Sequence, residues 1–174
     1  CDAAGVIHQQ KSVLQTPNGA CELHFTPNQN RIQVKSSSPQ MCTYFCGSGV
    51  YFEGDYLKMP AECSDAAKRK TDQLFNRQYR AKQYAQAVST LRQMWQTCAP
   101  TMHWLEEMSI RNNLAVTYAK MGDKDQCSKI LQPYKKEIVS KNPMEERDPP
   151  VTYVFEEEYK VQLKNARYNW KLCQ

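Results

Sequence analysis

The sequence predicts a mainly helical α+β fold, in which a small β element stapled by disulfides precedes about five helices. Three observations lead to this prediction. Residues 21–57 alternate apolar and polar side chains, which is the period of half-buried strands. Residues 65–173 space their apolar side chains as a helix does, with short polar breaks between segments. Within that part, residues 79–91 line up with residues 119–131, so one helix–turn–helix unit occurs twice.

These patterns divide the 174 residues into three parts. Residues 1–20 are polar and weakly patterned, as expected of an irregular arm or a tether. Residues 21–62 are expected to form the β element. Residues 63–174 are expected to form one helical domain.

The strands of the β element follow from their alternation. Residues 21–26 and 31–35 flank the turn-forming stretch 27–30, and we expect them to pair as a hairpin. Residues 50–52 predict a further short strand that ends before Gly54. A sheet of this size is marginal by itself and needs a disulfide or a covering helix.

The first two helices of the third part have a clear local start. Ser64 is expected to cap a helix over residues 65–81, since its side chain can accept a bond from a free N–H of the first turn. A second helix is expected over residues 85–97, with Val88, Leu91 and Trp95 on one apolar stripe.

The later helices are bounded by turn residues. Gly122 is expected to end the third helix, which contains Trp104 and Tyr118, and Asp123 can cap the fourth helix. Pro133 lies inside the pattern of the fourth helix, where its ring and its missing N–H should kink or end the helix.

A charged linker over residues 140–150 leads to the last helix. This helix is expected over residues 152–173 and carries an apolar stripe that should cover the second hairpin.

The repeated unit resembles the tetratricopeptide repeat, over roughly residues 66–139. The second copy carries Leu114, Ala115, Tyr118, the Gly122-Asp123 turn, Cys127 and Leu131. The first copy keeps Leu74, Tyr84, Ala87 and Leu91, but has Phe75 in place of a small residue and Lys82 in place of the turn glycine. The resemblance implies antiparallel helical hairpins that present a surface to a partner and carry no chemistry.

In tetratricopeptide proteins the first helices of successive hairpins line a groove, where some members clamp a peptide carboxylate through asparagine and basic side chains. The resemblance therefore implies a partner-binding set made of Asn76, Arg80, Asn113 and Thr117. Asp72 stands where a lysine is expected and would repel a carboxylate. Ordinary surface asparagines are the alternative.

A second candidate site lies in the β element. Tyr44, Tyr51 and Phe52 surround two glycines on a loop that disulfides are expected to hold. Aromatic side chains in such a loop are a common means of filling the cleft of a partner enzyme.

The chain has eight cysteines, which favours disulfides and an oxidising compartment, periplasmic or extracellular. Since the start of one helix lies beside the end of the next in an antiparallel hairpin, Cys63 should pair with Cys98. Cys127 should pair with Cys173 if the fourth and the last helix pack antiparallel. A rival pattern pairs Cys46 with Cys63 and Cys98 with Cys127.

The remaining cysteines leave alternatives open. Cys21 should pair with Cys42 or with Cys46, and the sequence does not choose between them. The first residues resemble the start of a mature bacterial lipoprotein, so Cys1 is a candidate for lipidation. If Cys1 carries no lipid, it is expected to take the cysteine that Cys21 leaves.

Composition and motifs disfavour several functions. The net charge of +5 is spread along the chain, and no aromatic and basic platform for nucleic acid is present. No cofactor motif, metal-ligand spacing or catalytic constellation occurs, so neither a cofactor nor a metal is predicted. His103 and Glu106 form only a common surface pair. A hydrolase stays the alternative of a different class.

We therefore expect a non-catalytic protein of the bacterial envelope that binds another protein. An inhibitor or immunity-type protein, directed against a secreted effector or a degradative enzyme, is favoured over an envelope adaptor or assembly scaffold. The membrane would be involved only through a lipid on Cys1.

Overall fold

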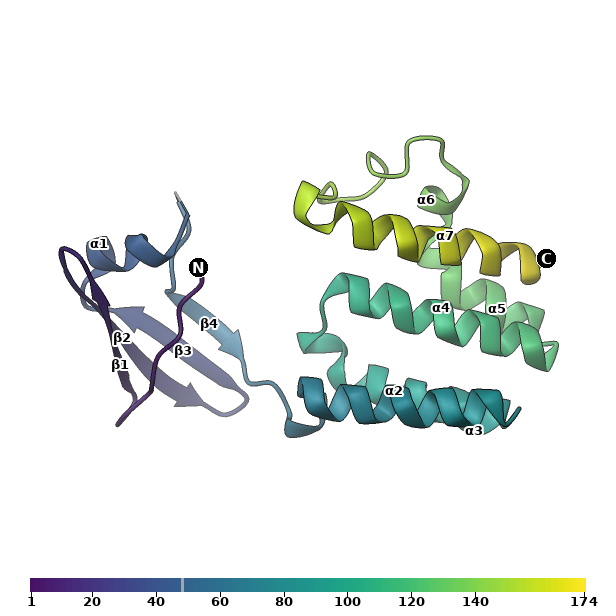
Figure 1. Cartoon of the computed structure of the whole chain (residues 1–174), viewed down its shortest axis with the longest axis horizontal. Helices are drawn as coiled ribbons and strands as arrows, with labels where there is room; N and C mark the ends of the chain where they lie inside the picture. The colour runs from purple at the N-terminus through teal and green to yellow at the C-terminus, as the bar shows by residue number, and fades with distance from the viewer. Residues whose placement is uncertain (48) are drawn as a thin grey trace. The chain divides into compact units, whose positions relative to one another are not determined.

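The computed structural model of the chain describes residues 1–47 and 49–174, which divide into two units, Cys1–Lys58 and Met59–Gln174 (Figure 1). The fold is mixed α+β, as the sequence predicts, with a small sheet in the first unit and helices in the second. The expected β element ends at residue 62, whereas the first unit ends at Lys58.

A four-stranded antiparallel sheet forms the first unit, in the order β1-β2-β3-β4. Its strands are β1 Lys11–Thr16, β2 Gly19–Asn28, β3 Arg31–Ser36 and β4 Gly54–Leu57. The predicted hairpin is confirmed as β2 and β3, whose register pairs Phe25 with Val34. Residues on one face are apolar, while the other face carries mostly polar side chains, which is the usual division in an antiparallel sheet with one covered face.

Two strand predictions were wrong. Residues 11–16 belong to a strand and not to an irregular arm, because Ser12 and Leu14 alternate onto the buried face of the sheet and pair with Leu23 and Cys21. The last strand is β4 and not residues 50–52. Phe52 turns its side chain toward the apolar face, and its carbonyl accepts a 2.7 Å hydrogen bond from the Tyr56 hydroxyl.

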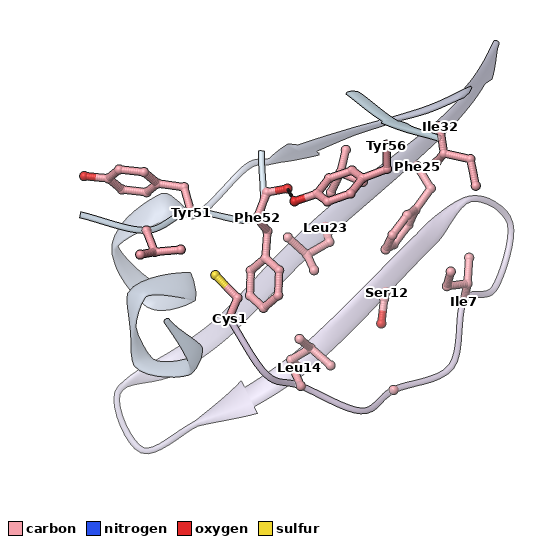
Figure 2. Close-up of a pocket in the computed structure, with 14 residues that line it drawn as sticks. Cys1, Ile7, Ser12, Leu14, Leu23, Phe25, Ile32, Tyr51, Phe52 and Tyr56 are labelled. Atoms are coloured by element: carbon pink, nitrogen blue, oxygen red, sulfur yellow. Dashed lines mark hydrogen bonds between the residues drawn. The ribbon is translucent and has the colours of Figure 1, made fainter. Parts of the chain in front are cut away.

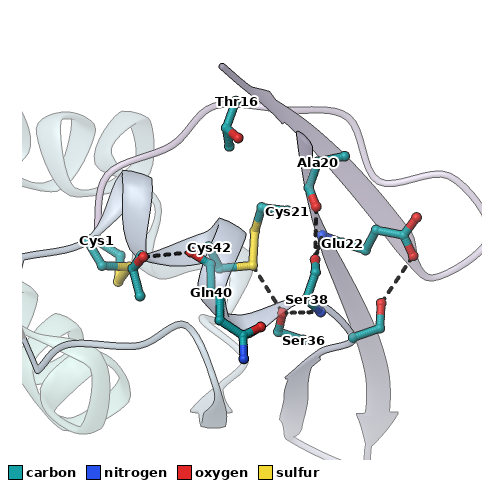
Figure 3. The surroundings of a disulfide bond; sticks show 12 residues. Cys1, Thr16, Ala20, Cys21, Glu22, Ser36, Ser38, Gln40 and Cys42 are labelled. Atoms are coloured by element: carbon teal, nitrogen blue, oxygen red, sulfur yellow. Dashed lines mark hydrogen bonds between the residues drawn. A yellow bond between two sulfur atoms is a disulfide. The ribbon is translucent and has the colours of Figure 1, made fainter. Parts of the chain in front are cut away.

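A short helix, α1 Pro39–Cys42, and a 3-10 turn, Thr43–Phe45, lie over part of the apolar face. The Cys21–Cys42 disulfide fixes α1 to β2 and decides the alternative that the sequence left open (Figure 3). Ser38 strengthens this attachment, since its hydroxyl donates to the Ala20 carbonyl at 2.9 Å and accepts the Glu22 N–H at 2.9 Å.

Cys1 is joined to Cys46 by a disulfide. This bond is the alternative that the sequence analysis set beside a lipid on Cys1. The N–H of Asp2 also donates to the Phe45 carbonyl at 2.9 Å, which holds the start of the chain beside the 3-10 turn.

Six helices build the second unit: α2 Asp65–Arg80, α3 Tyr84–Cys98, α4 Trp104–Met121, α5 Lys124–Leu131, α6 Lys135–Val139 and α7 Glu156–Leu172. Figure 1 shows α2, α4 and α7 stacked in one layer, with α3 and α5 forming a second layer behind them. One continuous core lies between the layers, and Leu91, Leu105 and Leu114 are among its fully buried members.

The helix ends follow the local signals. The Ser64 hydroxyl accepts the Ala67 N–H at 3.4 Å, and Gly122 ends α4 with a φ of 78°. The Asp123 carboxylate accepts the Gln126 N–H at 3.0 Å and starts α5. Pro133 interrupts the fourth helix as expected, because a 3-10 turn over Gln132–Tyr134 separates α5 from α6.

The last helix covers the second hairpin. Tyr159, Leu163 and Ala166 of α7 are buried, which confirms the apolar stripe. The buried Asn112 side chain donates to the backbone carbonyl of Gln162 at 2.9 Å, and the backbone carbonyl of Asn112 accepts from the Asn169 side chain at 3.0 Å. These bonds fix α7 against α4.

Both helical disulfides are confirmed, Cys63–Cys98 and Cys127–Cys173, and the rival pattern is excluded. With the two bonds in the first unit, all eight cysteines are paired. Four disulfides are typical of proteins that fold in an oxidising environment, periplasmic or extracellular. No helix in residues 1–47 and 49–174 is long and apolar enough to cross a bilayer.

Candidate functional site

Three helices of the second unit supply the polar lining of a hollow of about 180 Å³, here called the three-helix hollow, while Met94 of α3 and Met102 belong to its apolar lining. Each of the three helices contributes polar side chains that are three or four residues apart, so one face of each helix lines the hollow. Its polar lining consists of Lys68 and Asp72 from α2, Glu106 and Ser109 from α4, and Glu158 and Gln162 from α7.

The charges in the three-helix hollow are unbalanced. Lys68 is its one base, and its ammonium donates to both carboxylate oxygens of Glu106, at 2.9 and 3.0 Å. Asp72 and Glu158 add two further carboxylates. Three acids against one base leave a formal charge of −2 (1 − 3 = −2) in a small concave space.

The pKa values of two of these acids show the imbalance. Burial raises the pKa of Asp72, the charge of Glu106 raises it further, and only Lys68 opposes the shift. Burial would also raise the pKa of Glu106, but the bonds from Lys68 and from the His103 N–H outweigh it and hold that pKa below its ordinary value. Asp72 is exposed by its accessible surface, so the burial that raises its pKa is only partial.

His103 and Glu106 have a structural role. The Glu106 carboxylate accepts the His103 N–H at 3.0 Å, and the His103 ring nitrogen Nδ1 accepts the Leu105 N–H at 3.4 Å. The pair forms a capping box at the start of α4, which fixes Glu106 at the edge of the three-helix hollow.

The chemistry of the three-helix hollow suits a positive group. In residues 1–47 and 49–174, no three His, Cys, Asp or Glu side chains lie close enough together to hold a metal ion, and this includes the carboxylates of the three-helix hollow. A lysine or arginine side chain of a partner could instead reach Asp72 and Glu158 and form charge-assisted hydrogen bonds.

The residues that were predicted to line the groove differ in their exposure to solvent. Asn76 and Arg80 are exposed on α2, at four and eight residues after Asp72, and Asn113 is half-buried on α4. Thr117 was wrongly predicted to line the groove. It is fully buried, and its hydroxyl donates to the Asn113 carbonyl at 2.6 Å. Steps of four residues advance about 40° beyond a full turn, so residues along α4 rotate into the core.

The second candidate site proves to border a separate pocket. Tyr51 and Phe52 line an apolar pocket of about 620 Å³ over the sheet of the first unit (Figure 2). Tyr44 does not, since its side chain is 64% exposed and its ring meets only the edge of Phe45, at 5.2 Å between centroids.

The sequence analysis did not identify several residues of the three-helix hollow and of the apolar pocket. Glu158 lies in a run of three glutamates that indicates only a helix start, and its place in the three-helix hollow depends on how α7 packs on α4. The alternation of Leu23 with Phe25 indicated an apolar face. It gave no sign that part of that face stays uncovered.

Comparisons with known proteins add no relative: no family model matches the chain, and neither a curated protein nor a solved structure matches it. The function is therefore argued from the site alone.

Proposed function

We propose that the chain is a non-catalytic protein of the bacterial envelope that binds another protein through the three-helix hollow. The observation that carries this proposal is the gathering of Asp72, Glu106 and Glu158 from three different helices around one lysine. The group that such a hollow accepts is a basic side chain of the partner.

The environment of Asp72 favours binding of a cation. Its raised pKa reflects partial burial and repulsion from Glu106, and the positive charge of a guanidinium or ammonium beside it would offset both effects by stabilising the carboxylate. Because the three helices are held by a continuous core, the carboxylates are already in position before a partner arrives. Exposed Asn76 on the same helix can donate and accept further bonds to the partner's backbone.

Within this class we favour an inhibitor or immunity-type protein that blocks a toxic or degradative enzyme in the periplasm or outside the cell. Two small units that are each closed by two disulfides support that role, since disulfides limit local opening and thereby access by proteases.

A peptide panel tests the charge preference. Fluorescent peptides of one length are made in arginine-rich, neutral and glutamate-rich versions, and their polarisation is titrated with the oxidised protein. Arginine-rich peptides should bind most tightly, and their affinity should fall as salt rises, since part of the attraction is between exposed charges. Equal affinity for all three versions would refute the proposal.

A matched pair of variants assigns the binding to the three-helix hollow. Asp72→Asn with Glu158→Gln removes two of its charges, whereas Asp125→Asn with Glu157→Gln removes the same net charge from exposed positions outside it. Affinity for the arginine-rich peptides should drop at least tenfold in the first variant and change less than twofold in the second. An equal drop in both would mean that only the net charge of the protein matters.

A further inference from the structure

The apolar pocket of the first unit is a ligand site of its own. Its floor is the apolar face of the sheet, beyond the part that α1 covers, and Figure 2 shows Leu23 and Phe25 in that floor. One wall is the segment of residues 1–7, here called the strap, and the other wall carries Tyr51 and Phe52. Its volume of about 620 Å³ lies in the usual range for small-molecule sites.

The lining offers almost no polar chemistry. Among the described residues, every side chain that lines the pocket is uncharged, and the hydroxyls come only from Ser12, Tyr51 and Tyr56. The Tyr56 hydroxyl is already engaged with the Phe52 carbonyl at 2.7 Å. A charged or strongly polar ligand would lose its hydration in this pocket without gaining partners, so the occupant has to be apolar.

The pocket runs along the strands of the sheet. Its lining crosses four successive rows of paired residues on the sheet, from the row of Leu14 to the row of Ile32 and Tyr56. Four rows are three steps of two residues, or about 20 Å at the rise of a strand.

The lining and the length of the pocket favour one occupant. A helix of a partner protein is about 10 Å wide and could enter this open pocket with one face only. An extended peptide of the pocket's length would bring about six residues, whose N–H and C=O groups could find backbone partners only along residues 3–7, because the lining side chains supply few. A single hydrocarbon chain fits the length of the pocket and needs no polar partner.

The strap can act as a movable wall. It is held at one end by the Cys1–Cys46 disulfide and at the other by paired bonds between His8 and Lys11 at 2.9 and 3.0 Å. In the described part of the chain, no hydrogen bond between backbone groups ties residues 3–7. The strap lies close to the sheet at Gly5, where a Cβ would come within 2.6 Å of the Leu14 side chain.

We propose that this pocket binds the hydrocarbon chain of a lipid or other amphiphile, with the head group left outside in water. The site is independent of the three-helix hollow, so either assignment can fail without the other. Exposed Ile7 and Tyr51 at its rim are the side chains that a bound chain would cover.

A displacement experiment on the full oxidised chain tests the proposal. N-phenyl-1-naphthylamine should gain fluorescence on binding, and dodecanol and dodecanoic acid should each displace it, with affinities within about threefold because their chains are the same. Absence of saturable dye binding would overturn the proposal. Displacement by a leucine-rich peptide but by neither amphiphile would also overturn it and point to a partner protein.

The source of the chain is distinguished with phosphatidylcholine vesicles. Co-sedimentation of the protein with these vesicles would support the proposal, with the chain supplied by a bilayer. Displacement by dodecanol without co-sedimentation would support it equally, with the chain supplied by a free amphiphile.

Two neighbouring residues on the strap give a matched control. Ile7 lines the pocket and is 57% exposed, whereas Val6 is 84% exposed and does not line it. Ile7→Glu should weaken binding of the amphiphiles at least tenfold, while Val6→Glu should change it less than twofold. Tyr51→Glu is a second lining variant on the opposite wall, with the same expected loss. Equal behaviour of the Ile7 and Val6 variants would overturn the assignment.

Discussion

The Cys127–Cys173 disulfide should contribute a large share of the stability of the helical unit. It joins the start of α5 to the end of α7 and closes a loop with a sequence separation of 46. The loss of denatured-state entropy for a loop of this length corresponds to about 4 kcal/mol. Replacing both cysteines with alanine should therefore lower the free energy of unfolding by about that amount.

Tryptophan fluorescence can follow this change in the second unit alone. The three tryptophans of the chain, Trp95, Trp104 and Trp170, all lie in Met59–Gln174. That unit has 116 residues (174 − 59 + 1 = 116). At the usual unfolding entropy per residue, 4 kcal/mol corresponds to a fall in Tm of about 15 °C.

Reduction supplies the control for this prediction. In a reductant that opens all four disulfides, the alanine variant and the wild type should unfold within about 1 kcal/mol of each other, because only the small loss of buried side-chain volume remains. A difference below about 1 kcal/mol between the oxidised proteins would refute the reasoning, since the closed loop would then not limit the unfolded chain.

Three further changes concern single positions in the helical unit, each measured by urea unfolding. Gly122→Ala should lower the free energy of unfolding by about 1 kcal/mol, because φ at this residue is 78°. A Cβ there would meet nothing within 4 Å, so the cost is conformational and not steric. An unchanged free energy of unfolding would contradict the left-handed cap. Asp123→Ala should also cost about 1 kcal/mol by freeing the Gln126 N–H, and Asp123→Asn should retain most of the stability. The third change concerns Glu137, whose pKa is raised by burial against the opposing charge of Arg147. The folded state therefore holds that proton more tightly than the unfolded state, and this contribution to stability is lost as pH rises from 4.5 through the folded pKa. Glu137→Gln lacks this loss, so its stability relative to the wild type should rise over that window; a constant difference would contradict the raised pKa.

Most of the helical unit could be predicted because its signals are local. Ser64, Gly122 and Asp123 act on backbone groups within four residues of themselves, and Pro133 acts through its own ring. The disulfide pairs of this unit also followed, since hairpin geometry alone brings Cys63 to Cys98. Thr117 was placed wrongly because its exposure depends on the rotation of the whole of α4 against its neighbours.

The sites themselves depend on long-range packing. Asp72 and Glu106 are 34 residues apart (106 − 72 = 34), and Glu158 is a further 52 residues away (158 − 106 = 52), so no spacing rule connects them. Strand β1 was missed for a similar reason, since its six residues carry a weak pattern and are fixed by pairing with β2. Tyr51 and Phe52 could be named as candidates from the sequence, but the uncovered floor beneath them depends on where α1 ends.

The most direct test of a protein-binding role is capture from the envelope fraction with the immobilised oxidised chain, followed by quantitative mass spectrometry. The same capture is run with Asp72→Asn, Glu158→Gln and with the matched Asp125→Asn, Glu157→Gln variant. We predict a captured protein that is lost at least tenfold with the first variant and kept with the second. Capture that both variants keep equally would contradict a role for the three-helix hollow in binding.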